Sequence, residues 1–102
     1  MIKVSVMYPN TEGSDFDMAY YLHTHIPLVQ RLLGAALKGV AVDQGVGGKE
    51  PGSPAPYLAV GHLLFESPEA VQTALGALQA LLADIPNFTN SEPTVQISEV
   101  KL

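Results

Sequence analysis

Two tyrosines and two histidines lie close together in the run Tyr20-Tyr21-Leu22-His23-Thr24-His25-Ile26-Pro27-Leu28. An imidazole gives and takes protons near neutral pH, and a phenol can donate a hydrogen bond to a ligand oxygen. This run carries the only plausible acid/base chemistry in the chain. The elements that hold it decide which of these side chains could meet a substrate.

Apolar residues around this run recur at the spacing of a helix over residues 14–33. At about 100° per residue, one arc of this helix collects Met18, Leu22, Ile26, Val29 and Leu33, and Tyr21, Leu28 and Leu32 widen it. His25 lies near the centre of the arc and should point inward, whereas His23 lies about 200° away. Tyr20 faces away from the arc. We therefore predict that His25 is the catalytic residue.

Tyr8 and Tyr21 are the predicted substrate-binding residues. Tyr8 ends the first strand, Tyr21 shares the inward arc, and either phenol could donate to a ligand oxygen. The alternative is that both rings are half-buried with their hydroxyls in water. His25 also has an alternative role as a core residue bonded to a backbone carbonyl, because Pro27 leaves the carbonyl of His23 without its usual donor.

Other site chemistries find less support in the sequence. Cysteine is absent, which excludes a thiolate nucleophile and a cysteine-ligated metal. His23 and His25 diverge on a helix, and His62 is expected to pack in a strand or at an interface, so we expect no metal site. No serine has the context of a nucleophile elbow, and no helix follows the glycines at 45–48 to make a phosphate site. We expect no cofactor.

The order of elements predicts a fold of class α+β. Residues 2–8 alternate as a strand, Ser14 with Asp17 begins the first helix, Pro27 kinks or restarts it, and Gly34 ends it. Further strands are predicted at 37–46, 57–66 and 94–101. Ser67-Pro68-Glu69 begins a second helix, whose buried stripe should be Val71, Ala74, Leu75, Leu78, Leu81 and Leu82.

This βαββαβ order is typical of a ferredoxin-like, four-stranded antiparallel sheet with two helices on one face. The second and third strands are joined by a glycine- and proline-rich hairpin loop at 43–56, which could be a lid or a dimer arm. The third strand has apolar residues on both faces, so the face without helices requires a cover. A homodimer through that sheet face would supply it.

Length and composition restrict the partners and the location. A chain of 102 residues forms a single domain, here 1–102, and its 15% of charged residues is below the roughly 25% of ordinary domains. The net charge is -5 and the basic residues are scattered, so we expect no nucleic acid and no membrane as partners. No secretory or membrane-spanning pattern is seen, which favours a cytoplasmic location.

Several motifs spread over the whole chain resemble the EthD family of the dimeric α+β barrel superfamily. They are Tyr8-Pro9, Phe16-Asp17, Tyr20-Tyr21, His25-Ile26-Pro27-Leu28-Val29, Pro56-Tyr57, Phe65-Glu66-Ser67, Asp84-Ile85-Pro86-Asn87-Phe88-Thr89-Asn90, Pro93 and Gln96-Ile97-Ser98-Glu99-Val100. The resemblance implies two subunits packed sheet to sheet, with a small-molecule pocket between each sheet and its helices. It also implies an association with bacterial ethyl tert-butyl ether degradation alongside a haem monooxygenase system.

The resemblance leaves the reaction open, because relatives in the superfamily include isomerases, cofactor-free monooxygenases, cyclases and dehydratases. Our leading hypothesis is an EthD-like protein that binds a small apolar oxygenated molecule and catalyses a cofactor-free isomerisation, dehydration or cyclisation. The alternative is a non-catalytic ligand carrier or accessory protein to an oxygenase system. A third interpretation is a structural dimer whose pocket is filled by side chains.

Overall fold

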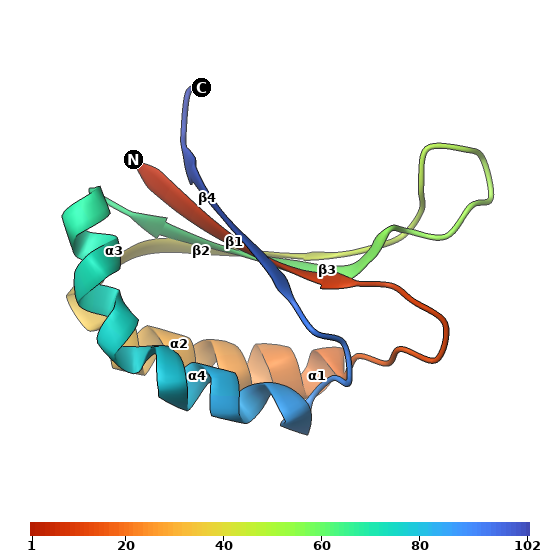
Figure 1. Cartoon of the computed structure of the whole chain (residues 1–102), viewed down its shortest axis with the longest axis horizontal. Helices are drawn as coiled ribbons and strands as arrows, with labels where there is room; N and C mark the ends of the chain where they lie inside the picture. The colour runs from red at the N-terminus through yellow and green to blue at the C-terminus, as the bar shows by residue number, and fades with distance from the viewer.

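A four-stranded antiparallel sheet carries both helical segments on one of its faces in the computed structural model, which describes residues 1–102 (Figure 1). The strands are β1 Ile2–Pro9, β2 Leu37–Gln44, β3 Tyr57–Phe65 and β4 Thr94–Glu99. Their order in the sheet is β2-β3-β1-β4. This confirms the predicted ferredoxin-like α+β fold.

Each helical segment is built from several short pieces. The first contains α1 Met18–Tyr20, the π-helical η1 Tyr21–His25, α2 Ile26–Leu33 and the 3-10 turn η2 Gly34–Ala36. The second contains α3 Pro68–Ala74, the 3-10 turn η3 Leu75–Ala77, α4 Leu78–Asp84 and the 3-10 turn η4 Ile85–Asn87. None of these helices is long and apolar enough to cross a membrane.

The start of the first helix differs from the prediction. Asp17, not Ser14, is the N-cap, and its carboxylate accepts the backbone N–H of Tyr20 at 3.0 Å. Ser14 is held in the preceding turn, where its hydroxyl donates to the carbonyl of Thr11 at 2.6 Å. Two other predicted helix boundaries are confirmed. Gly34 ends α2 with a positive φ of 54°, and Ser67 caps α3.

A π turn replaces the predicted kink or restart of the first helix. The N–H of Ile26 donates to the carbonyl of Tyr21, five residues back, directly before Pro27. This wider turn changes the helical phase between the residues before it and the residues after it. Leu22 and Leu32, predicted to face inward, are therefore 43% and 41% exposed. The inward face is made by Tyr21, His25, Ile26, Val29 and Leu33, all buried.

The two faces of the sheet have different surroundings. On the helix side, Val4, Val6 and Tyr8 of β1 point toward the helical segments, and the core forms two clusters there. The buried members of the clusters are Tyr8, Tyr21, Ile26, Ala59 and Phe88 in one, and Val29, Leu33, Phe65 and Val71 in the other. On the opposite, open face, alternate residues of β3 with Ser5 and Met7 of β1 meet no helix.

The predicted buried stripe of the second helix is only partly buried. Val71 is buried, but Leu75, Leu78 and Leu82 are 49%, 44% and 49% exposed. The edge strand β4 faces this helix with Val95 and Ile97, which are 57% and 62% exposed. Helix and edge strand therefore do not close on each other, because no further strand or loop covers the gap between their apolar side chains.

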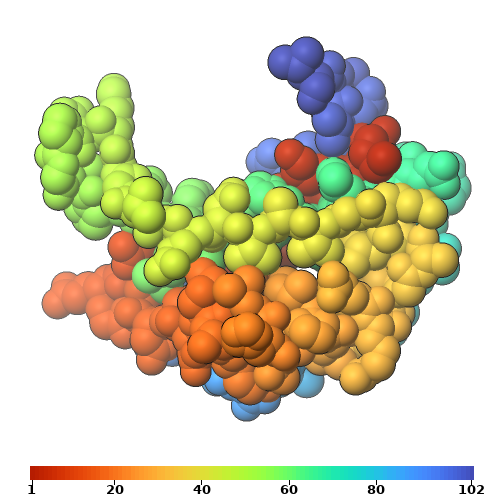
Figure 2. All heavy atoms as spheres, turned by 180° about the vertical axis from the view of Figure 1, so that it is seen from behind, coloured from red at the N-terminus to blue at the C-terminus, as the bar shows by residue number.

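Two segments rise from the open face of the sheet. The loop at residues 45–56 extends beyond β2 and β3, and the C-terminal residues extend beyond β4, both away from the helices (Figure 1). In the space-filling view they stand at opposite ends of the molecule with a hollow between them (Figure 2). The loop therefore does not lie over the helix side of the sheet.

Candidate active site

A cavity of about 140 Å³ lies between the sheet and the two helical segments. Tyr8 reaches it from the end of β1, whereas Tyr21 and His25 reach it from the π turn. The remaining lining is apolar apart from the backbone of Gly61. The structure therefore brings together all three residues that the sequence singled out.

His25 is held by a carboxylate from the other helical segment. Its Nδ1 lies 2.8 Å from Oδ2 of Asp84, at the end of α4, and the residue is only 5% exposed. Because a carboxylate only accepts, Nδ1 carries the proton in this bond. In the neutral ring Nε2 is then the unprotonated nitrogen, and it has no hydrogen-bond partner in the protein.

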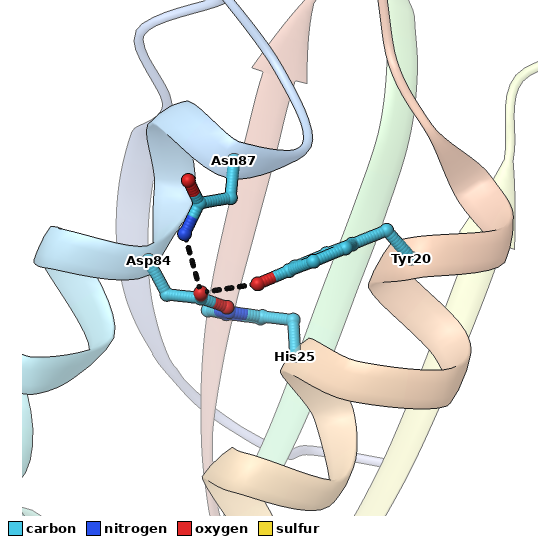
Figure 3. A network of polar contacts seen from close by, with 4 residues as sticks. All are labelled: Tyr20, His25, Asp84 and Asn87. Atoms are coloured by element: carbon cyan, nitrogen blue, oxygen red, sulfur yellow. Dashed lines mark hydrogen bonds and ion pairs between the residues drawn. The ribbon is translucent and has the colours of Figure 1, made fainter.

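Asp84 is itself the centre of a polar network (Figure 3). Its Oδ1 accepts the Tyr20 hydroxyl at 2.7 Å and the Asn87 amide at 3.0 Å. Desolvation alone would raise the pKa of Asp84, but hydrogen bonds from Tyr20, His25 and Asn87, with the charge of His25, lower it. The carboxylate thus stays ionised although its side chain is only 12% exposed. The same bond to Asp84 raises the pKa of Tyr20.

Tyr8 and Tyr21 present protonated phenols at the cavity. Burial is the main cause that raises the pKa of Tyr21 to about 12. Burial raises the pKa of Tyr8 still further, assisted by the neighbouring Tyr21 and by the hydrogen bond that Tyr8 donates to it. The hydroxyl of Tyr21 lies over Gly61, where a Cβ would overlap it. The missing side chain at 61 is what allows this phenol to reach the sheet.

Aromatic rings fix the orientation of these groups. The rings of Tyr21 and His25 stack with centroids 5.4 Å apart and planes 17° from parallel. Phe88, directly after η4, lies 4.6 Å from the ring of His25 and 5.1 Å from that of Tyr21. Tyr21 and His25 are four residues apart in the first helical segment and both face inward, which allows this stacking.

The arrangement is suited to proton transfer next to an oxygen atom. Asp84 fixes the His25 tautomer and would stabilise the imidazolium formed when Nε2 accepts a proton. A phenol would donate to the oxygen that gains negative charge. The apolar lining strengthens both interactions, because few polar groups compete with them.

Asp84 and Tyr20 are the site residues that the sequence did not reveal. The segment around Asp84 is a polar connector in the sequence, and the hydrogen bond to His25 joins residues 59 positions apart. Helical phase placed Tyr20 away from the site, yet its hydroxyl reaches Asp84 on the other helical segment. The one available signal was that Asp84-Ile85-Pro86-Asn87 and the histidine segment both belong to the resembling motifs.

The three histidines are far from sharing a site. His23 is exposed, and His62 lies across the sheet from His25, on the open face. There the Nε2 of His62 donates to Asp43 and its Nδ1 accepts the Ser5 hydroxyl, both at 2.9 Å. Ser5 lies in the middle of a paired strand, whose amides are used in the sheet and cannot form an oxyanion hole. Ser5 therefore lacks the free backbone donors that a serine nucleophile needs beside it.

Comparison with known proteins gives a family match that includes His25 and Asp84. The model of the EthD domain matches residues 10–92. An EthD-like protein from Ralstonia eutropha has a solved structure with 40% identity and a TM-score of 0.93, covering 99% of this chain and 92% of that one. A search of curated protein sequences gives no match.

Two more distant structures show the fold alone. An ethyl tert-butyl ether (EthD) family protein from Bacillus halodurans has 21% identity and a TM-score of 0.75, covering 99% of each chain. A protein from Arabidopsis thaliana has 15% identity and a TM-score of 0.72, covering 100% of this chain and 97% of that one.

Proposed function

Because this chain belongs to the EthD domain family, we propose that it binds a small, mostly apolar molecule carrying an oxygen atom and moves one of its protons with His25. The observation that carries the proposal is the hydrogen bond between Asp84 and His25 at the wall of an apolar cavity. A buried acid/base pair that lines a cavity is a candidate site for proton transfer.

The reaction class that suits these groups is isomerisation, dehydration or cyclisation. Nε2 of His25 takes a proton from a carbon next to a carbonyl, and a phenol donates to the carbonyl oxygen as the C–H electrons move toward it. The same nitrogen then returns the proton to another carbon, or to a leaving hydroxyl in a dehydration. Asp84 balances the charge of the intermediate imidazolium. Tyr8 and Tyr21 are the substrate-binding residues in this scheme.

The test is turnover of lactones, hydroxylated ethers and phenolic polyketide mimics by the full chain. We expect His25→Ala to abolish turnover and Asp84→Asn to reduce it by a factor on the order of a hundred or more, within the range for a positioned acid/base group. His23→Ala is the matched control, because it removes an exposed imidazole two positions away. Turnover that survives in a folded His25→Ala protein contradicts the mechanism.

A second candidate function is a ligand carrier or accessory protein to an oxygenase. It is favoured by the nearly uniform apolar lining of the cavity, which suits holding a molecule without reacting with it. This alternative predicts saturable binding of the same compounds with no product. His25→Ala would then weaken binding only modestly, through the loss of one polar contact.

The open face of the sheet supports a homodimer. Leu58, Val60 and Leu64 of β3 are only half-buried there, and the hollow between the loop at 45–56 and the C-terminus could receive a second sheet (Figure 2). Pairing two such faces would remove this apolar surface from water. In that arrangement the loop serves as a dimer arm, and the His25 cavity stays on the outer, helix side.

A further inference from the structure

An apolar groove of about 350 Å³ runs between the second helical segment and the edge strand β4. All of its lining side chains are hydrophobic, and several of the most exposed apolar residues of the chain belong to it, namely Leu75, Leu78, Leu82, Val95 and Ile97. Apolar side chains exposed side by side on one surface usually mark a binding site. The His25 network does not use this groove.

The groove and the His25 cavity are continuous. Six residues line both, namely Val4, Leu63, Leu78, Leu81, Leu82 and Val95. His25 lies beyond one end of the groove, near Ile85 and Pro93, whereas Val71, Leu75 and Ile97 lie at the other end. From Leu82 to Val71 the helical rise gives a length on the order of 16 Å.

The polarity of this combined space is distributed unequally. Every polar side chain, from Tyr8, Tyr21 and His25, lies at the cavity end. The groove offers neither charge nor a hydrogen-bonding side chain along its length. A ligand that fills both parts must therefore carry its oxygen at one end and an uncharged hydrocarbon segment at the other.

We propose that the substrate of this site is a tailed molecule, with a carbonyl or hydroxyl head at His25 and an unbranched hydrocarbon tail that lies in the groove. This proposal rests on the proposed function and specifies its substrate class. The groove is lined by residues of the second helical segment and so lies on the helix side of the sheet, where a homodimer formed through the open face would leave it free. Its continuity with the cavity favours one tailed ligand over a helix or a second copy.

Binding of unbranched methyl ketones from butanone to undecanone by the full chain tests the proposal, with titrations followed by backbone amide shifts and by calorimetry. Each buried methylene adds about 0.8 kcal/mol, so we expect the Kd to fall about fourfold per methylene until the tail reaches the end of the groove. Changes in backbone amide chemical shift should be confined to residues around His25 with butanone. With the longer ketones they should extend to Val71 and Ile97.

Two variants at the far end of the groove separate tail binding from head binding. Leu75→Gln and Ile97→Thr should weaken undecanone binding about tenfold or more and leave butanone binding unchanged, because only the long tail reaches these positions. Val46→Thr is the matched control, since Val46 is 97% exposed in the loop on the other side of the sheet. It should bind both ketones like the wild type.

The outcomes distinguish the tailed substrate from the proposed function of His25. A Kd that does not change with chain length, or variants that weaken both ketones equally, overturns the tailed substrate while His25 keeps its proposed role. Groove shifts that depend on protein concentration without ketone overturn it in favour of a second copy. Butanone shifts that are absent around His25 contradict the proposed function itself.

Discussion

Asp84 Oδ2 lies 2.8 Å from Nδ1 of His25, and this contact joins the two helical segments beside an apolar cavity. The same carboxylate accepts Tyr20 and Asn87 through its other oxygen. Because one anion holds both the ring of His25 and the end of the second helical segment, the site and the packing of the helices depend on the same charge.

Acid should weaken the fold through Asp84. Its pKa is lower in the folded chain than the ordinary value of about 4, so its stabilisation is full above that value and is lost as the pH falls through the folded pKa. Asp84→Asn should be less stable than the wild type at neutral pH and lose less stability on acidification. Urea unfolding over a pH series measures both effects. Glu12→Gln, at an exposed carboxylate, should follow the wild-type curve.

Alkali should weaken the fold through Tyr8 and Tyr21. Both pKa values are raised, that of Tyr21 to about 12. Their stabilisation is therefore full below the unfolded value of about 10 and is lost as the pH rises through the folded values. Tyrosinate absorbance should show these phenols ionising together with unfolding. Tyr8→Phe and Tyr21→Phe should each remove part of the absorbance change that accompanies unfolding. An unchanged absorbance change in both variants would contradict the claim that burial raises these two pKa values. Tyr57→Phe is the control.

Gly61→Ala should disturb the site from the sheet side. The new methyl group would overlap the hydroxyl of Tyr21, so the ring must move, at a cost of about 1–3 kcal/mol in the free energy of unfolding. Gly76→Ala is a matched control, because a Cβ there meets no atom and the substitution should be neutral or stabilising by up to about 1 kcal/mol. Equal unfolding free energies for the two variants would show that Tyr21 does not depend on Gly61.

Val60→Lys should prevent self-association through the open face. A lysine in the middle of β3 would place a charge in the proposed contact between two sheets, where no partner is available for it. Sedimentation equilibrium should show a dimer for the wild type and a monomer for the variant. Gln30→Lys adds the same charge at an exposed position of α2, on the helix side of the sheet, and should remain dimeric. A monomeric wild type at all concentrations contradicts the proposed homodimer.

The sequence was sufficient for the architecture and for one wall of the site. Period-two alternation placed Tyr8 on the apolar face of β1, and helical phase placed Tyr21 and His25 on the inward face. The fold then brought these residues to the same cavity, because β1 and the first helical segment are packed together. Local periodicity is enough for such residues, since each depends only on its own element.

The contribution of the second helical segment to the site could not be derived from local periodicity. The pairing of His25 with Asp84 depends on how two helical segments align over the sheet, which no local pattern encodes. The π turn before Pro27 changes the helical phase, so the prediction that Leu22 faces inward was wrong. Leu75 is exposed because the sheet ends at β4 and no further strand covers this part of the helix. The apolar stripe of the helix does not reveal this, since it looks the same whether or not it is covered.

The π turn between Tyr21 and His25 also affects how relatives should be compared. A π turn amounts to one residue inserted into an α-helix. In a relative whose helix is α-helical throughout, the residue occupying the space of His25 is displaced by one position along the chain. An alignment without a gap would then pair His25 with a surface residue and suggest that the histidine had been lost. Homologues of this helix should be matched by superposed coordinates before a missing histidine is taken as a change of chemistry.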